Sequence, residues 1–93
     1  MWKVIVVFLP GCPTCNMMLP LIEDVVAEYG LQTEWVDADK MPEAFERYEV
    51  EVVPTMIFYK EEKEVTRMAG MIGETILRER IEKNTCISRE SII

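Results

Sequence analysis

The chain has 93 residues, the size of one domain, and its 49% apolar and 29% charged residues are typical of a globular protein. Its 17 acidic and 10 basic residues give a formal net charge of −7, which disfavours nucleic acid and anionic membrane surfaces as partners. Histidine is absent, which excludes histidine-based metal sites and catalytic dyads or triads that need an imidazole. We therefore expect a single domain over residues 1–93, with no nucleic-acid or membrane partner.

The three cysteines are too few, and of the wrong parity, for a secreted disulfide scaffold, so a reducing cytoplasm is the expected location. The N-terminus has one feature of a signal sequence, since Lys3 precedes an apolar run over residues 4–9. That run is six residues long, below the roughly 7–15 of a signal h-region. It is also too short to cross a membrane.

The first half of the chain predicts a strand, a long helix and a second strand. Residues 2–8 are rich in Val and Ile without alternation, as in a strand buried on both faces. Apolar residues recur at helical spacing over residues 16–29: Met18, Leu21, Ile22, Val25, Val26 and Tyr29. Pro20 is expected to kink this helix and Gly30 to end it.

A second strand is predicted over residues 33–36, parallel to the first because a helix connects the two. Asp39 or a nearby residue is then expected to cap a short helix. Pro42 would lie in the first turn of that helix, with Phe45 and Tyr48 on its inner face.

The second half predicts a hairpin and a last helix. Residues 55–59 are β-branched and aromatic, residues 60–64 form a charged turn, and residues 65–69 complete the hairpin. Residues 74–84 predict a helix with three core positions, Ile76, Leu77 and Ile81, and a short tail follows it. The order β-α-β-α-β-β-α predicts an α/β fold, a four-stranded mixed sheet with helices on both faces.

Cys12 and Cys15 are separated by two residues and lie between the first strand and the long helix. This setting is typical of a thiol–disulfide redox motif. Cys12 would precede the helix, where unpaired N–H groups and the positive end of the helix dipole favour a thiolate. Cys15, one turn into the helix, would be close enough to resolve a mixed disulfide.

Other interpretations of the cysteines are open. The pair would be half of a zinc site only if a dimer shared two motifs, because zinc takes four ligands and Cys86 is the one other candidate. Buried, inert thiols are a second alternative. Cys86 is expected to be a bystander, with a regulatory or dimer-forming thiol as the alternative. Met17 and Met56 are the two methionines expected near the motif; the others are expected in the core.

Over residues 4–84 the chain resembles the thioredoxin superfamily. The Cys-Pro-Thr-Cys run stands at the family's redox motif, Pro20 at its helix-kinking proline, and the Val-Pro-Thr segment at its cis-proline, which packs against the cysteines. Gly70 matches the glycine after the last strand. The resemblance implies two catalytic residues, Cys12 and Cys15, and five substrate-binding residues, Pro13, Thr14, Val53, Pro54 and Thr55.

The chain departs from thioredoxins at several positions. It starts without their N-terminal strand and helix, which makes it similar to glutaredoxins and other short family members. Gly11 replaces the tryptophan before the first cysteine, and Asn16 replaces a basic residue after the second. Val6 stands where thioredoxins have a buried acid that assists proton transfer. The Gly-Gly cradle with which glutaredoxins hold glutathione is absent from residues 69–74.

The resemblance thus implies a cytoplasmic dithiol–disulfide oxidoreductase, in which Cys12 attacks and Cys15 resolves. It implies no bound cofactor, and we expect a monomer that reduces protein disulfides and takes electrons from a reductase of the thioredoxin-reductase type. Two alternatives are a glutathione-dependent, glutaredoxin-like protein and a thioredoxin-fold adaptor whose cysteines are not catalytic.

Overall fold

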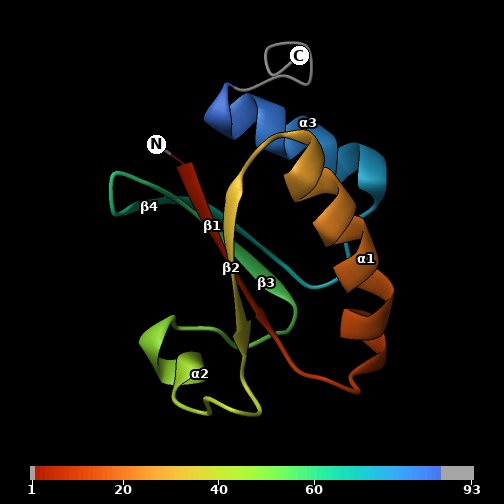
Figure 1. Cartoon of the computed structure of the whole chain (residues 1–93), viewed down its shortest axis with the longest axis vertical. Helices are drawn as coiled ribbons and strands as arrows, with labels where there is room; N and C mark the ends of the chain where they lie inside the picture. Colours follow the sequence, from red (N-terminus) through yellow and green to blue (C-terminus); the bar gives the residue numbers. More distant parts are fainter. Residues whose placement is uncertain (1, 87–93) are drawn as a thin grey trace.

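A computed structural model describes residues 2–86, whose elements follow the predicted order (Figure 1). They are β1 (Trp2–Phe8), α1 (Pro13–Glu28), β2 (Gln32–Asp37), α2 (Ala44–Arg47), β3 (Thr55–Lys60), β4 (Lys63–Ala69) and α3 (Glu74–Thr85). The sheet order is β2-β1-β3-β4, with β1 and β2 parallel and the other pairs antiparallel. The predicted α/β class and four-stranded mixed sheet are confirmed.

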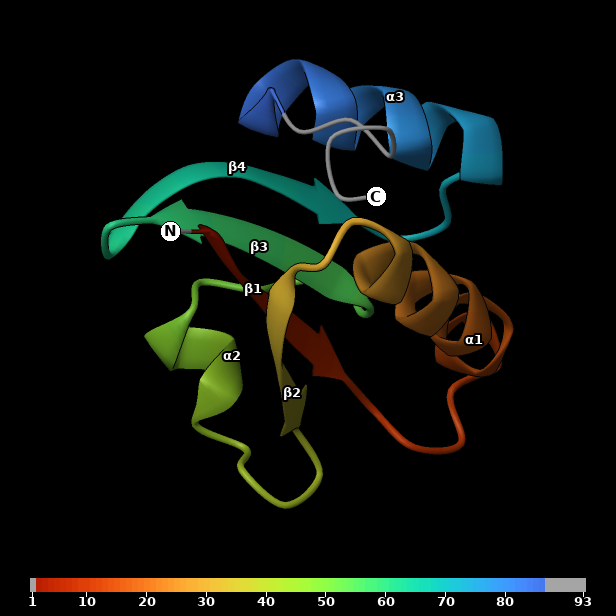
Figure 2. The same cartoon turned by 45° about the horizontal axis from the view of Figure 1, so that its top comes forward.

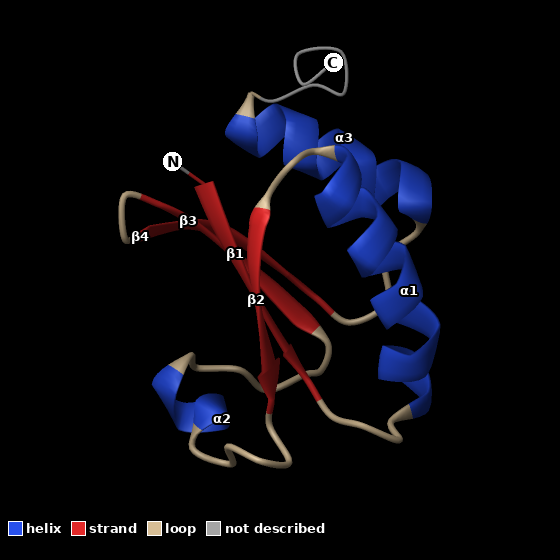
Figure 3. Cartoon of the chain, in the orientation of Figure 1, coloured by secondary structure: helices blue, strands red, loops and turns tan. Residues whose placement is uncertain are grey.

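The helices cover both faces of the sheet, α1 and α3 on one and α2 on the other (Figures 2 and 3). Under α1 and α3, one apolar cluster joins side chains of both helices to the sheet; its fully buried members include Val4, Val6, Ile22, Val25, Phe58 and Leu77. Under α2, a second cluster includes Ile5, Val7, Val36, Ala44, Val50 and Ile57. Strand β1 contributes alternate residues to the two clusters, so the predicted burial on both faces is confirmed.

Helix α1 begins at Pro13, three residues before the predicted range, and so includes Cys15. It contains Pro20 and ends at Glu28. Gly30, two residues later, is left-handed with a φ of +64°, which confirms the predicted stop. The N–H of Gly30 donates to the carbonyl of Ala27 at 3.2 Å, and that of Leu31 donates to Val26 at 2.9 Å. Two carbonyls of the last turn are thereby satisfied.

The prediction that Asp39 caps α2 is wrong. Glu43 occupies the N-cap position without a capping side-chain hydrogen bond, and Pro42 lies before the helix and not in its first turn. Asp37 explains the difference, because its carboxylate accepts hydrogen bonds from the N–H groups of Asp39 (2.9 Å) and Lys40 (3.3 Å). That carboxylate organises a turn at the end of β2, and the helix starts only after it.

The β3–β4 hairpin has a shorter turn than predicted. Only Glu61 and Glu62 lie between the strands, with φ of +51° and +69°, and Lys60 pairs with Lys63 in the ladder. Both turn residues are thus in the left-handed region, which two-residue hairpin loops of type I′ require.

The prediction that Ile76 of α3 is a core residue is wrong, because its side chain is 50% exposed. Leu77 and Ile81 are buried as expected, and Thr85, a further turn along, completes the buried stripe. Residues 87–93 of the predicted tail lie outside the described residues. Among residues 2–86, no helix has the length and apolar character needed to cross a membrane.

Candidate active site

The link between β1 and α1 places Cys12 at the start of the helix. Gly11 adopts a φ of +80°, a conformation that favours glycine, and reverses the chain after the strand. The N–H of Cys12 donates to the Leu9 carbonyl at 3.4 Å, and its own carbonyl accepts the N–H of Asn16 at 2.9 Å. Cys12 is therefore the N-cap, with extended backbone, and Pro13 occupies the first helical position. Its side chain remains partly exposed.

Two features favour the thiolate of Cys12. The backbone N–H of Cys15, followed by the backbone N–H of Thr14, hydrogen-bonds its sulfur and lowers the pKa of the Cys12 thiol, against an opposing contribution from desolvation. The side chains of the same two residues lower this pKa further. The first turn of α1 also carries no acidic side chain that would oppose the positive end of the helix dipole.

Cys15 has the opposite environment. Its side chain is fully buried, and burial raises the pKa of the Cys15 thiol because a thiolate there would lose its hydration. The nearby Cys12 raises this pKa further, while the backbone N–H of Leu9, 3.5 Å from the Cys15 sulfur, opposes the rise. Both cysteines are free thiols in the structure. One partly exposed thiol with a lowered pKa thus lies beside a buried thiol with a raised pKa.

Val6 occupies the core under α1 with no exposed surface. It belongs to the same apolar cluster as Met18, which follows Cys15 by one helical turn. Among the described residues, Cys12 is the one ionisable group that affects the pKa of Cys15. Within residues 2–86, the core beneath the motif therefore offers no carboxylate to accept a proton from the buried thiol.

The Val53–Pro54 peptide bond is cis, and Pro54 is buried next to α1, where it lines a narrow crevice together with Met18. The Pro54 carbonyl accepts the N–H of Gly70 at 2.9 Å, which ties the segment to the end of β4. The hydroxyl of Thr55 donates to the Val52 carbonyl and closes a local turn. The predicted substrate-binding segment thus lies beside the first turns of the helix that carries the cysteines.

Exposed apolar side chains surround this end of the fold. Met17 on α1 is 65% exposed, and Met71 and Val52 are 60% and 50% exposed. Val52 lies against Gly70, the residue that precedes Met71. Met56, which was also expected near the motif, is buried in the core under α1 and α3. Met17 is therefore available to a docking partner and Met56 is not.

Comparisons with known proteins identify the family. The Thioredoxin family model matches residues 2–83. The chain belongs to the thioredoxin family. It is 36% identical to thioredoxin of Chlamydia trachomatis over 83% of the chain and 76% of that protein. It is 38% identical to thioredoxin-2 of Saccharomyces cerevisiae over 73% of the chain and 68% of that protein.

Solved structures agree with this assignment. The X-ray structure of Fasciola hepatica thioredoxin is 34% identical and superposes with a TM-score of 0.78, covering 89% of this chain and 80% of that one. A thioredoxin from Nicotiana alata is 27% identical, also with a TM-score of 0.78, over 89% of this chain and 72% of that one. As a member of the thioredoxin family, the chain is a thiol–disulfide oxidoreductase.

Three contacts at the site were not predicted from the sequence. The N–H groups of Leu9 and Gly70 reach Cys15 and Pro54, and the Arg67 side chain reaches the backbone after α2. Backbone donors carry no signature in the sequence. The two carbonyls that Arg67 contacts lie 18 and 19 residues away and outside any strand, so only the folded structure reveals this contact.

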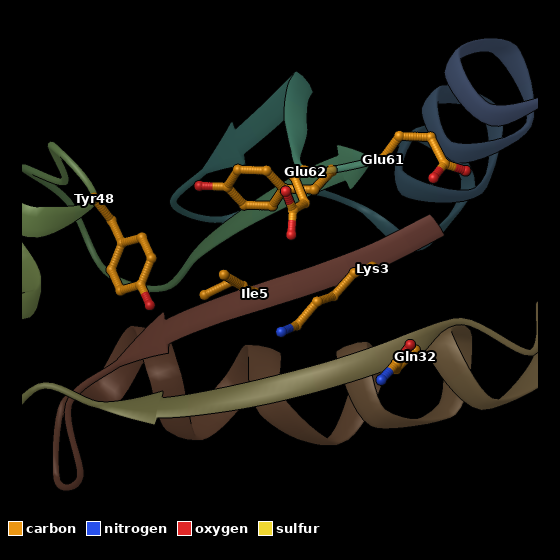
Figure 4. A pocket seen from close by; sticks show the side chains of 7 residues that line it. Lys3, Ile5, Gln32, Tyr48, Glu61 and Glu62 are labelled. Carbon is orange, nitrogen blue, oxygen red and sulfur yellow. The ribbon is translucent and has the colours of Figure 1, made fainter. Parts of the chain in front are cut away.

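A hollow of about 540 Å³ lies on the α2 face, near the start of β1 and away from the cysteines (Figure 4). Lys3 and Ile5 of β1, Gln32 of β2, Tyr48 after α2 and Glu62 of the hairpin turn lie around it. Because Cys12 follows the opposite end of β1, this hollow is separate from the redox site.

Proposed function

We propose that the chain reduces disulfide bonds of proteins, with Cys12 as the attacking thiolate and Cys15 as the resolving thiol. The observation that carries the proposal is the contrast between the two cysteines: Cys12 is accessible and its pKa is lowered, whereas Cys15 is buried and its pKa is raised. Thiolates are the nucleophiles of disulfide exchange, so this contrast sets the order of the two steps.

The reaction transfers two electrons from the dithiol to the substrate. The Cys12 thiolate attacks one sulfur of the substrate disulfide, forms a mixed disulfide and releases the other substrate sulfur as a thiolate, which takes up a proton. Cys15 then loses its proton and attacks the Cys12 sulfur. This step forms the Cys12–Cys15 disulfide and releases the second substrate thiolate.

Substrate would dock between Cys12 and the segment around Pro54. Pro13 and Thr14 border the thiol on the helix side, and Val53 and Thr55 flank Pro54 on the other. The surrounding exposed apolar side chains suit a partly unfolded, apolar segment, and an extended chain there would pair by strand addition.

The electron donor we propose is a thioredoxin-reductase-type flavoprotein in the cytoplasm. Thioredoxins generally receive electrons from such reductases, and residues 69–74 lack a Gly-Gly glutathione cradle. Comparing turnover with thioredoxin reductase and with glutathione plus glutathione reductase would identify the donor. Faster turnover with glutathione would contradict this part of the proposal.

The function itself is tested by insulin reduction with dithiothreitol as the electron source. Wild type is expected to accelerate precipitation of the insulin B chain and Cys12→Ser to abolish the acceleration. Cys15→Ser, mixed with insulin without dithiothreitol, is expected to accumulate a mixed disulfide on Cys12. Equal rates with and without the protein would refute the proposal. A mixed disulfide on Cys15 would reverse the two roles.

A further inference from the structure

We infer that Arg67 of β4 is a positioning residue that holds the substrate-docking loop, residues 49–54, in the arrangement that protein substrates require. The inference rests on the proposed function, because it assigns a role in docking protein disulfides. Arg67 contacts neither cysteine in any described interaction; it acts through the backbone of the loop.

The guanidinium of Arg67 connects β4 to the chain that follows α2. Its Nη1 donates to the carbonyls of Tyr48 and Glu49, each at 3.0 Å. Its Nε and Nη2 donate to the two carboxylate oxygens of Glu64, each at 2.7 Å, so the pair is bidentate. The Arg67 side chain is 29% exposed. Because Glu64 fixes the Nε and Nη2 side of the planar guanidinium, Nη1 is directed at the chain after α2.

The two carbonyls lie where the chain leaves α2. The N–H of Val50 donates to the Phe45 carbonyl at 2.9 Å, and that of Glu49 donates to Glu46 at 3.2 Å. Glu49 adopts a φ of +52°, a position that helix ends normally fill with glycine. Such a conformation of a non-glycine residue persists when its surroundings fix it. Arg67 supplies that fixation by binding the carbonyls of the two peptide groups that flank the Cα of Glu49.

Strand β4 holds the other end of the same loop. Gly70, three residues after Arg67, donates its N–H to the Pro54 carbonyl at 2.9 Å. A groove of about 210 Å³ lies between the loop and the strand, lined by Glu51 and Val52 as well as Arg67. Loop residues 49–54 are therefore attached at one end to the Arg67 side chain of β4 and at the other to the backbone of Gly70, the residue that follows β4.

Loss of the Arg67 attachment should affect protein substrates more than small ones. A protein disulfide has to dock an extended segment along the loop, whereas a small aromatic disulfide needs only access to the Cys12 thiolate. The groups that lower the pKa of Cys12 lie on α1, remote from Arg67 in the sequence. The intrinsic reactivity of the thiolate should therefore not change.

The test compares Arg67→Met, Arg67→Lys and a control, Arg78→Met, with wild type. Arg78 is also partly buried, at 17% exposed, and pairs with two carboxylates, those of Glu28 and Glu74, but it joins α3 to α1. The measurements are insulin reduction, reduction of 5,5′-dithiobis(2-nitrobenzoate), and iodoacetamide alkylation of Cys12. Hydrogen exchange of the Val50 and Gly70 amides reports directly how often the hydrogen bonds at the two ends of the loop open.

For Arg67→Met we expect kcat/KM for insulin to fall about tenfold, chiefly through KM, as for a loop that is competent about a tenth of the time. Rates with the small disulfide and with iodoacetamide should stay within about twofold. The Val50 and Gly70 amides should exchange faster relative to core amides. Arg67→Lys, which keeps a charge but loses the fork, should be intermediate. Arg78→Met should reduce insulin and the small disulfide at the same rates as wild type.

Equal losses for insulin and for the small disulfide would overturn the inference, as would unchanged loop amides or an equal effect in Arg78→Met. If Arg67→Met does not fold, Arg67→Lys and its amide exchange decide the matter. An inactive wild type would instead refute the proposed function, while the amide exchange would still test whether Arg67 holds the loop.

Discussion

Replacing Val6 by aspartate tests how the buried thiol loses its proton. Val6 is fully buried in the cluster under α1, and no described carboxylate affects the pKa of Cys15. If proton loss from Cys15 limits the resolving step, a carboxyl at position 6 should accelerate that step near pH 7. We expect Val6→Asp to resolve mixed disulfides faster than wild type at neutral pH and to show a flatter pH–rate profile.

The same substitution should cost stability. Losing the buried valine costs about 2 kcal/mol, and burying a carboxyl without a partner adds roughly 1–3 kcal/mol. We therefore expect the free energy of unfolding to fall by about 3–5 kcal/mol, which is a large part of the stability of a domain of this size.

Val6→Asn is the matched control, because it has the same shape and burial cost but no titratable proton. Burial raises the pKa of the introduced carboxyl above its unfolded value of about 3.9. Above that pH the unfolded chain releases a proton that the folded chain retains, so stability falls as pH rises. The stability gap between the two variants should thus be small near pH 3 and widen until the pH reaches the folded-state pKa of the carboxyl, above which the ionised carboxylate can accept the proton of Cys15.

The assay is stopped-flow resolution of a preformed mixed disulfide on Cys12 from pH 5 to 9, beside urea unfolding of both variants. Identical pH–rate profiles for Val6→Asp and Val6→Asn would show that proton transfer to this position does not limit the reaction. A stability gap that does not change with pH would show that the introduced carboxyl is not buried.

Brief iodoacetamide treatment near neutral pH should label Cys12 about tenfold faster than Cys15, because the pKa of Cys12 is lowered and that of Cys15 is raised; peptide mapping that finds mainly Cys15 labelled would contradict this. Cys86→Gly should keep insulin reduction within about twofold and raise the free energy of unfolding by about 0.5–1 kcal/mol, since Cys86 ends α3 at a φ of +60°. Loss of activity in that variant would place Cys86 in the mechanism. Glu61→Asn combined with Glu62→Gly should stabilise the hairpin by about 1–2 kcal/mol in urea unfolding, because both residues have positive φ; an unchanged midpoint would argue against strain in this turn.

Much of the fold could be predicted because its signals are local. The Val and Ile run, the helical spacing before Gly30 and the β-branched third strand gave β1, α1 and β3 to within a few residues. The position of Cys12 at the helix start also followed from local pattern, because a strand, a Pro-Gly turn and a helix leave little other arrangement.

The errors arose where side chains outside the local pattern decide the structure. Asp39 has a side chain suited to a helix cap, but the Asp37 carboxylate accepts the N–H groups of Asp39 and Lys40 and forms a turn there instead of a helix start. Ile76 fits the apolar spacing of α3, yet the helix turns Leu77 and Ile81 toward the sheet. The contact of Arg67 with the chain after α2 depends on the packing of that segment beside β4, which no local pattern contains.

The burial of Cys15 has a consequence for the lifetime of the covalent intermediate. Because the raised pKa of Cys15 slows its deprotonation at neutral pH, the mixed disulfide on Cys12 persists for longer. The Cys12 sulfur of that mixed disulfide lies at the start of α1, where it is partly exposed. During that interval any small thiol in the surroundings competes with Cys15 for the same bond. The share of mixed disulfides that Cys15 resolves, and the share that an external thiol cleaves, therefore depend on the ambient thiol concentration as well as on the protein itself.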